Sequence, residues 1–350
     1  MNIAKALKKV SKNIQNKLSL NPQVDHDPPH SVVHDHPRHF LEHTPPNEAR
    51  SSVVPTARHV GEASSSVVPP QNDGDCLFKP VVFSLRSLKF SWHICSKKSA
   101  AGGTGSEFHS ELEASKLVRH HNLLSLVGYC LGEGEKILVY EYMPNGTLSQ
   151  HLFDWEVEGL QSLTWNQRMI IALDIAKGLE YLHGSLTKST IVHGDLKPSN
   201  ILLGENMRAK IADFGLGCFI PHNKSSIRTG NARGTFGYIA PEYAGSGTVA
   251  PPGDVYSFGV MLMELMTGSK AVDDSRGEDR RSIVTWFQEM RKDENLLISA
   301  VDETIDTTEE DTLATIGIIR KLAFKCTERS SGRRPDMSRV VSVLYPLVEN

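Results

Sequence analysis

Residues His193–Asn200 have the sequence His-Gly-Asp-Leu-Lys-Pro-Ser-Asn, which is the most informative stretch of the chain. It holds an acid, Asp195, a base, Lys197, and an amide, Asn200, at the spacing Asp-x-Lys-x-x-Asn. A short hairpin is predicted next, followed by a second acid in the triplet Asp-Phe-Gly that begins at Asp213. Each triplet alone is weak evidence, whereas the ordered set of loop, hairpin and Asp-Phe-Gly is a specific pattern.

These residue types suit phosphoryl transfer, which needs positioned charges, metal ions and a group that accepts the proton of the attacking hydroxyl. Asp195 is placed to accept that proton, and Lys197 can reach the transferred phosphate. The side chains of Asn200 and Asp213 offer the hard oxygen ligands that Mg²⁺ prefers. We therefore expect Asp195, Lys197 and Asn200 to be catalytic, and Asn200 and Asp213 to bind the metal.

Further signals follow in the order that this chemistry requires. A substrate peptide is expected beside residues 234–238, Gly-Thr-Phe-Gly-Tyr, just before an Ala-Pro-Glu triplet that ends at Glu242. Residues 255–267 are apolar on nearly every face, which predicts a helix buried at the centre of a domain. Asp254 caps that helix and is expected to hold the backbone of the catalytic loop. Arg334 is the expected ion-pair partner of Glu242, because a guanidinium suits a buried carboxylate.

The predicted elements form a small strand-bearing lobe followed by a large helical lobe. Alternating apolar residues predict a strand at 88–95, and a helix is predicted at 107–118. Two further strands are predicted near 123–130 and 136–143. Helical periodicity then appears near 163–183, 254–267, 282–298, 308–326 and 336–349.

From about Glu107 to Asn350 the chain resembles the plant receptor-like kinases of the Pelle-related group. The resemblance is carried by Leu-Val-Gly-Tyr-Cys at 126–130, by Leu-Val-Tyr-Glu-Tyr-Met-Pro-Asn-Gly-Thr-Leu at 138–148 and by Gly-Thr-Phe-Gly-Tyr-Ile-Ala-Pro-Glu-Tyr at 234–243. The stretches that begin at His151 and Met207 are similar to the TMK (transmembrane kinase) receptor branch of that group.

This resemblance implies an α+β, bilobal protein-kinase-like fold with a truncated N-lobe sheet and a complete, mostly helical C-lobe. It implies ATP and Mg²⁺ as cofactors, and a protein Ser/Thr substrate or a partner kinase. Tyr140 would guard the back of the nucleotide pocket. The residues implied to bind the cofactors are Glu111, Glu141, Met143, Lys197, Asn200 and Asp213, with Glu141 and Met143 offering backbone groups to adenine.

The N-lobe departs from the family pattern. The Gly-x-Gly-x-x-Gly-x-Val hairpin over the ATP phosphates and the Val-Ala-x-Lys strand are absent from the sequence, and Gly102–Gly105 lies too close to the Glu111 helix to replace the hairpin. Lys97 or Lys98, just past the predicted 88–95 strand, is the candidate replacement for the strand lysine. Losing one preorganised charge contact costs about 2.7–4 kcal/mol. A weakly active kinase and a pseudokinase-like interaction module are therefore both open interpretations.

Departures from the family pattern also occur within the matched region. Gly194 replaces the Arg of His-Arg-Asp, whose guanidinium pairs with a phosphorylated activation segment, so this switch is missing. Ser115 occupies a position on the Glu111 helix where an apolar residue normally packs.

Composition separates a basic amphipathic helix at 1–20 and a disordered Pro/Ser/His-rich linker at 21–80 from the rest of the chain. The resemblance implies that the rest consists of a truncated kinase N-lobe at 81–143 and a kinase C-lobe at 144–350. The first segment carries five lysines and no acid. A solvated, frayed helix, contact with an anionic membrane surface and an organelle transit peptide are three open interpretations of it.

The formal net charge of −3 excludes a general preference for nucleic acid. The five cysteines are odd in number and form no Cys-x-x-Cys pair, which is typical of a reducing compartment. No apolar run reaches the roughly 18–20 residues that span a bilayer, and no secretory signal is visible. We therefore expect a cytoplasmic chain without a transmembrane segment, peripheral at the plasma membrane if residues 1–20 contact lipid.

Overall fold

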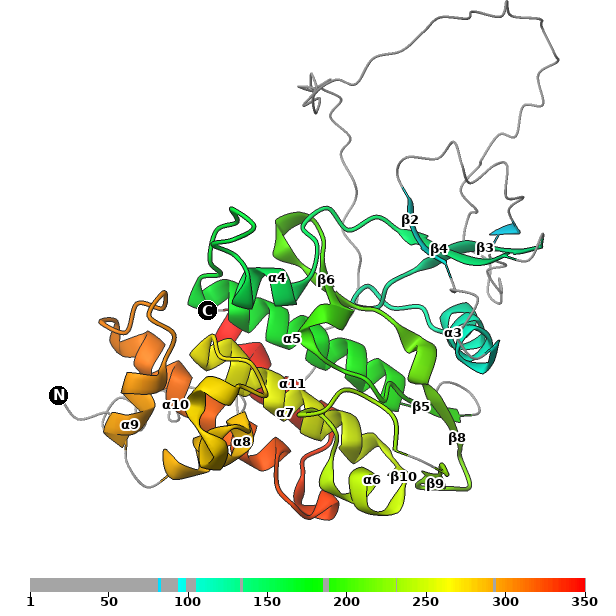
Figure 1. The fold of residues 1–350 in the computed structure, drawn as a ribbon. Helices are drawn as coiled ribbons and strands as arrows, with labels where there is room; N and C mark the ends of the chain where they lie inside the picture. The colour runs from blue at the N-terminus through cyan, green and yellow to red at the C-terminus, as the bar shows by residue number, and fades with distance from the viewer. Residues whose placement is uncertain are drawn as a thin grey trace, which may run out of the picture. The chain divides into compact units, whose positions relative to one another are not determined.

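The computed structural model describes residues 81–82, 94–98, 105–132, 135–184, 189–230, 232–291 and 294–349 (Figure 1). The predictions made for residues 1–20 and 21–80 lie outside these ranges. Within them, a strand-bearing part precedes a mostly helical part, as expected from the sequence.

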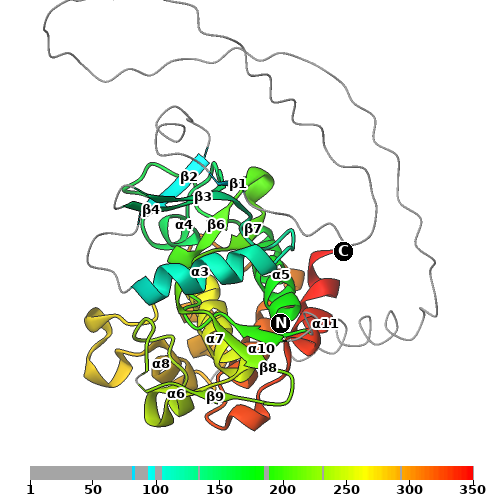
Figure 2. The same cartoon turned by 90° about the vertical axis from the view of Figure 1, so that its right-hand side faces the viewer.

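The strand-bearing part, called the N-lobe below, is a four-stranded sheet with one helix. Its elements are β1 (Val81–Val82), β2 (Ile94–Lys98), α3 (Gly105–Leu117), β3 (Leu126–Gly132) and β4 (Glu135–Glu141). The strand order is β1-β3-β4-β2, with β4 antiparallel to both of its neighbours and β1 parallel to β3. The helix α3 lies beneath the sheet in Figure 2, and a core that includes Phe108, Leu112, Leu138 and Tyr140 joins the two.

The strand predicted at 88–95 differs from the one observed. Residues 83–93 lie outside the described ranges, and the described strand β2 runs from Ile94 to Lys98. The prediction that the strand ended before Lys97 is therefore wrong. The physical reason is that pairing with β4 continues through Lys98, so the partner strand sets where β2 ends.

The helical part, called the C-lobe, follows β4. Its helices are α4 (Leu148–Phe153), α5 (Trp165–His183), α6 (Pro241–Ser246), α7 (Pro251–Thr267), α8 (Ile283–Glu289), α9 (Glu294–Ala300), α10 (Glu310–Cys326) and α11 (Met337–Val348). Its short strands are β5 (Ser189–Val192), β6 (Ile201–Leu203), β7 (Ala209–Ile211), β8 (Cys218–Pro221), β9 (Ile227–Arg228) and β10 (Thr248–Val249). The predicted hairpin after the catalytic loop is the antiparallel pair β6–β7.

The central helix of the C-lobe is α7, as predicted. Every residue from Asp254 to Thr267 is buried, and α7 packs against α5, α8 and α10. Because the helix is apolar on all sides, it is stable only when other helices surround it. The buried N-terminal end of α7 can therefore hold the catalytic loop in a fixed position.

The single helix predicted at 282–298 is wrong, because two helices, α8 and α9, occupy this region. Ile283, Phe287 and Met290 are buried in the C-lobe core, whereas Leu296 on α9 is 48% exposed. The packing that holds α8 against α7 thus ends near Met290, and apolar spacing alone overstated the length of the helix.

Candidate active site

The catalytic loop, residues 193–200, is anchored to α7 through Asp254. The backbone amides of His193 and Gly194 donate to the two oxygens of Asp254 at 2.8 and 3.0 Å. His183 Nε2 lies 2.8 Å from the same carboxylate. Burial opposes ionisation, but the hydrogen bond and charge of His183 outweigh it and hold the pKa of Asp254 below its usual value. The expected role of Asp254 in holding the catalytic loop is confirmed. The prediction that Asp254 caps the helix is wrong, because α7 begins at Pro251 and its N-cap residue is Ala250.

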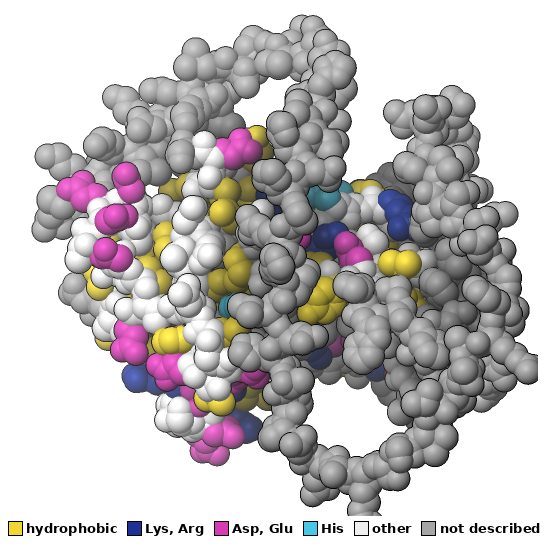
Figure 3. Space-filling view, turned by 90° about the horizontal axis from the view of Figure 1, so that it is seen from above, with side chains coloured by type: hydrophobic (Ala, Val, Ile, Leu, Met, Phe, Trp, Pro, Cys, Tyr) yellow, Lys and Arg dark blue, Asp and Glu magenta, His cyan; other side chains and the backbone are white. Residues whose placement is uncertain are grey.

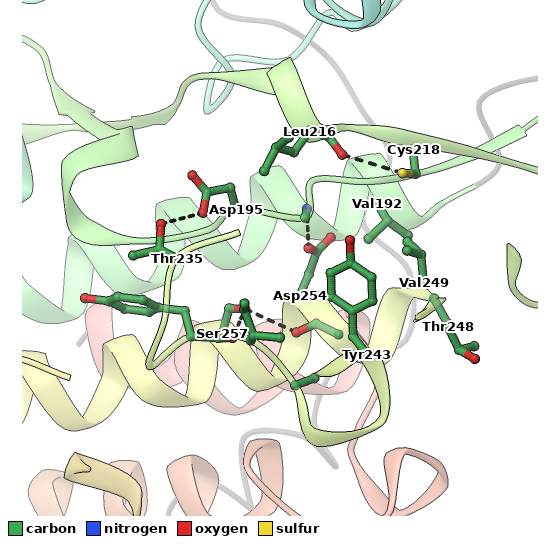
Figure 4. Close-up of a pocket in the computed structure, with 16 residues that line it drawn as sticks. Val192, Asp195, Leu216, Cys218, Thr235, Tyr243, Thr248, Val249, Asp254 and Ser257 are labelled. Atoms are coloured by element: carbon green, nitrogen blue, oxygen red, sulfur yellow. Dashed lines mark hydrogen bonds between the residues drawn. The ribbon is translucent and has the colours of Figure 1, made fainter. Parts of the chain in front are cut away.

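Asp195 is held as a carboxylate by two neighbours. Lys197 Nζ lies 2.7 Å from one oxygen, and the hydroxyl of Thr235 donates to the other at 2.7 Å (Figure 4). Lys197 also donates to Thr235 Oγ1 at 2.6 Å. Burial alone would raise the pKa of Asp195, but the hydrogen bonds from Lys197 and Thr235 keep it below the usual value. The arrangement therefore preserves an ionised group that can accept a proton.

Asn200 directly precedes β6 and Asp213 follows β7, so both residues lie at the same end of the β6–β7 hairpin. The amide nitrogen of Asn200 donates to the backbone carbonyl of Asp195 at 2.8 Å and to its carboxylate at 3.2 Å. This orientation directs the amide oxygen of Asn200 away from those acceptors. Asp213 has a left-handed backbone with φ of 66°, and its carboxylate accepts from the amide of Gly215 at 3.3 Å.

The donor set fits Mg²⁺, because an amide oxygen and a carboxylate are both hard ligands. Among the described residues, no group of three or more His, Cys, Asp or Glu side chains could hold a metal ion. A metal at Asn200 and Asp213 would thus complete its coordination with water or phosphate oxygens, as Mg²⁺ commonly does.

A cavity of about 270 Å³ brings the acidic groups of both lobes together. Glu111 of α3, Asp195 of the catalytic loop and Asp213 all line it, and Leu138 of β4 forms part of its wall. Glu141 and Met143, the predicted adenine contacts, are not among its lining residues. The cavity therefore gathers Glu111, Asp195 and Asp213, whereas Lys197 and Asn200 are not among its lining residues.

Glu141 and Met143, the predicted adenine contacts, make hydrogen bonds with other residues of the chain. The carboxylate of Glu141 accepts from Lys210 Nζ at 2.7 Å and from the amide of Ser125 at 2.8 Å. Met143 is 8% exposed and belongs to the N-lobe core, and its carbonyl accepts from the amide of Gly146 at 3.4 Å. Their proposed contact with adenine stays a prediction.

Glu111 belongs to a buried polar cluster that the sequence did not predict. The hydroxyl of Tyr140 donates to Glu111 Oε1 at 2.8 Å, and Ser115 Oγ lies 3.2 Å from the same hydroxyl. All three side chains are at most 4% exposed. Burial, followed by the charge of Glu111, raises the pKa of Tyr140 and keeps its proton in place. Ser115 thus fills an apolar position of the family with a hydroxyl that has a partner.

A glycine replaces the usual arginine at position 194. Gly194 has φ of +80°, and a Cβ atom there would lie 3.0 Å from the carbonyl oxygen of Leu216. Beneath it, a cavity of about 30 Å³ is lined by residues that include Cys218 and Asp254 (Figure 4). Burial, followed by the charge of Asp254, raises the pKa of the Cys218 thiol. This space is polar at its edge and has room for one or two water molecules.

The segment that ends at Glu242 is fastened to the C-lobe as expected. Arg334 Nη1 and Nη2 lie 2.6 and 2.7 Å from the two oxygens of Glu242. Thr235, in the predicted peptide-binding stretch, was not identified as a partner of Asp195 from the sequence. Its place in Gly-Thr-Phe-Gly-Tyr was the available signal, but only folding brings residue 235 to residue 195.

Comparison with known proteins identifies relatives over most of the chain. The family model described as protein tyrosine and serine/threonine kinase matches residues 93–344. The chain is 51% identical over 252 residues to the Arabidopsis thaliana protein named receptor-like kinase TMK4, a match that covers 72% of this chain and 27% of that protein. It is 51% identical over 253 residues to the Arabidopsis thaliana receptor-like kinase TMK2, covering 72% and 28%.

A rice relative gives the same picture. The chain is 44% identical over 260 residues to the receptor protein kinase WSS1 of Oryza sativa subsp. japonica, covering 73% of this chain and 28% of that protein. The chain thus matches less than a third of the length of these curated relatives. Within its described residues, none of the helices combines the length and apolar character needed to cross a bilayer.

Proposed function

Because the chain belongs to the protein tyrosine and serine/threonine kinase family, we propose that it transfers a phosphoryl group from ATP to Ser or Thr residues of proteins. Its predicted resemblance to plant receptor-like kinases and its α+β kinase fold are confirmed. The observation that carries the proposal is the ionised Asp195 carboxylate, held 2.7 Å from Lys197 and 2.7 Å from Thr235.

Each predicted residue has a role in this proposal. Asp195 accepts the proton of the substrate hydroxyl, and Lys197 neutralises charge on the transferred phosphoryl group. Asn200 and Asp213 would hold Mg²⁺, which would supply positive charge to the phosphate oxygens. Glu141 and Met143 offer backbone groups to the adenine ring. The peptide substrate lies beside residues 234–238.

We assign the missing strand lysine to Lys97. In the β2–β4 pairing, Lys97 lies opposite Leu138 and Lys98 lies opposite Ile137. Residues directly opposite each other in an antiparallel pair belong to the same face of the sheet, and successive residues alternate between faces. Leu138 lines the cavity that holds Glu111, whereas Ile137 belongs to a separate cluster on the other face. The register therefore favours Lys97 over Lys98 as the partner of Glu111.

The second candidate function is a pseudokinase-like interaction module. It is favoured by the absence from the sequence of the Gly-x-Gly-x-x-Gly-x-Val hairpin, which normally covers the ATP phosphates. The loss of one preorganised contact lowers the rate by about 10²–10³. We therefore propose that the kinase activity of this chain is weak. We also propose that the active site is formed by two lobes, residues 81–143 and 144–350.

A transfer assay separates the two functions. The full chain is incubated with Mg²⁺ and radiolabelled ATP, with casein as a generic substrate, beside the variants Asp195→Ala, Lys97→Met and Lys98→Met. We expect measurable transfer that is lost in Asp195→Ala and Lys97→Met and kept in Lys98→Met. Equal incorporation by the wild type and Asp195→Ala would favour the interaction module.

Nucleotide binding is followed in parallel by a thermal-shift titration with Mg-ATP. We expect Asp195→Ala to keep the shift, because Asp195 acts on the substrate hydroxyl rather than on ATP. Lys97→Met should reduce the shift, with Lys98→Met as the matched control one residue away on the other face. An equal loss in both lysine variants would overturn the assignment of Lys97.

Location and partners follow from the same family membership. We propose a cytoplasmic site of action, with a protein substrate or a partner kinase as the binding partner. This proposal rests on the receptor-like kinase relatives.

A further inference from the structure

A second, larger hollow opens in the C-lobe away from the active site. It has a volume of about 790 Å³ and lies between the segment after α4 and the segment after α9. Its lining, residues 152–157, 267–270, 273, 286 and 299–304, shares no residue with the active-site cavity. This hollow is called the aromatic groove below.

The groove is lined by aromatic side chains, two of which have a cation over the ring: Lys270 Nζ lies 5.6 Å from the centre of Phe153, and Arg276 Cζ lies 5.1 Å from the centre of Trp286. Phe153, Trp155 and Trp286 line it and are only partly buried. Val157 on its rim is 92% exposed. Clustered apolar side chains with a polar rim are typical of a surface that binds another chain.

The rim of the groove is acidic. Its lining includes five carboxylates and one amine: Asp154, Glu156, Asp273, Asp302, Glu303 and Lys270. Cations compensate two of these carboxylates: Arg168 lies 2.7 Å from Asp302, and the charges of Arg276 and Lys270 act on Asp273. Figure 3 shows acidic side chains gathered, with apolar ones among them, at the end of the molecule that carries α9 in Figure 1. The groove therefore fits a partner that is both basic and apolar.

We propose that this partner is the chain's own segment 1–20. The segment carries five lysines and no acid, so its charge is opposite to that of the rim. Ile3, Leu7, Val10, Ile14 and Leu18 recur at helical spacing and supply one apolar stripe. An amphipathic helix that lays its apolar face into an aromatic groove, with lysines against rim carboxylates, is a recurrent mode of recognition.

Connection through the same chain makes even a weak contact effective. About 60 residues, 21–80, join this segment to the rest of the chain, and a random coil of that length spans an average of roughly 40 Å. That distance is comparable to the diameter of a domain of this size, so the segment can reach the groove. A tether of this kind gives an effective concentration of about a millimolar or less, which populates a contact of millimolar affinity.

Carboxylate-to-amine crosslinking of the full chain tests the proposal. A zero-length carbodiimide reagent joins a carboxylate to a lysine only when the two are in contact, and mass spectrometry identifies the pair. We expect crosslinks from lysines of segment 1–20 to Glu156 and Glu303. The yield should fall when salt is added, because the contact is electrostatic.

Charge-reversal variants give the decisive comparison. In the double variant Glu156→Lys/Glu303→Lys, crosslinks from segment 1–20 to Asp154 and Asp273 should fall by about fivefold or more. The matched control Glu113→Lys reverses an exposed carboxylate on α3 and should leave the yield unchanged. Because the reversed side chains are exposed, the variants should unfold at the wild-type temperature. Crosslinks spread evenly over surface carboxylates, or unchanged in the double variant, would overturn the proposal.

The same segment on a membrane is the competing outcome. Two results together would show that segment 1–20 binds lipid and not the groove. The full chain would float with vesicles that contain 30% phosphatidylserine, and crosslinks to the groove would be absent in samples without vesicles. Groove crosslinks present without vesicles support the proposal.

Discussion

Tyr140→Phe removes a single oxygen atom from the buried polar cluster of the N-lobe. That hydroxyl donates to Glu111 at 2.8 Å, and Tyr140 and Glu111 are 4% and 3% exposed. A hydrogen bond to a charged group contributes about 1.5–3 kcal/mol to stability. Because Glu111 also makes other interactions, the lower half of that range is expected for the loss in free energy of unfolding.

Urea unfolding followed by tryptophan fluorescence measures the loss. The matched control is Tyr142→Phe, because Tyr142 is 59% exposed and its substitution should change the free energy of unfolding by less than about 0.5 kcal/mol. Ser115→Ala, alone and combined with Tyr140→Phe, tests whether the cluster acts as a unit. The two hydroxyls are 3.2 Å apart, so we expect them to couple by about 0.5 kcal/mol or more.

Two results would refute this reasoning. If Tyr140→Phe unfolds at the same urea concentration as Tyr142→Phe, the hydroxyl does not stabilise the N-lobe. If the effects of Ser115→Ala and Tyr140→Phe simply add, Ser115 is a passive substitution and not a member of the cluster.

Three further predictions concern the C-lobe. Burial raises the pKa of Glu264 from 4.5 to about 8. Between these pH values the folded state keeps a proton that the unfolded state has released, so the free energy of unfolding should fall as the pH rises from 4.5 towards 8. Glu264→Gln should flatten this decline in urea unfolding across the same pH range. Gly194→Ala should lower the free energy of unfolding by about 1–2 kcal/mol, because Gly194 has a left-handed backbone with φ of +80°. The control Gly245→Ala should cause no such loss, because no atom lies within 4 Å of the added carbon. Arg334→Met should cost about 3 kcal/mol, because it leaves the Glu242 carboxylate without the buried guanidinium that now pairs with it at 2.6 Å; a loss below 1 kcal/mol in thermal unfolding would contradict this.

Apart from residues 282–298, the predicted C-lobe helices agreed with the structure because their signals are local. An all-apolar helix can only be central, which the complete burial of α7 from Asp254 to Thr267 confirms. Its first turn then places Asp254 under the catalytic loop. The helix predicted at 282–298 failed for the opposite reason: apolar spacing continues across it, while the chain forms two helices there, and Leu296 on the second is 48% exposed.

The residues of the catalytic loop and the chemistry they suit were determined by sequence alone, because Asp195, Lys197 and Asn200 lie within one short stretch whose spacing carries the signal. Tertiary structure alone decided which residue of β4 lies opposite each lysine of β2. Lys97 and Lys98 are neighbours of the same type, but Lys97 pairs with Leu138 of the cavity wall and Lys98 pairs with Ile137. That register depends on a strand about 40 residues further along the chain, which the sequence near the lysines does not specify.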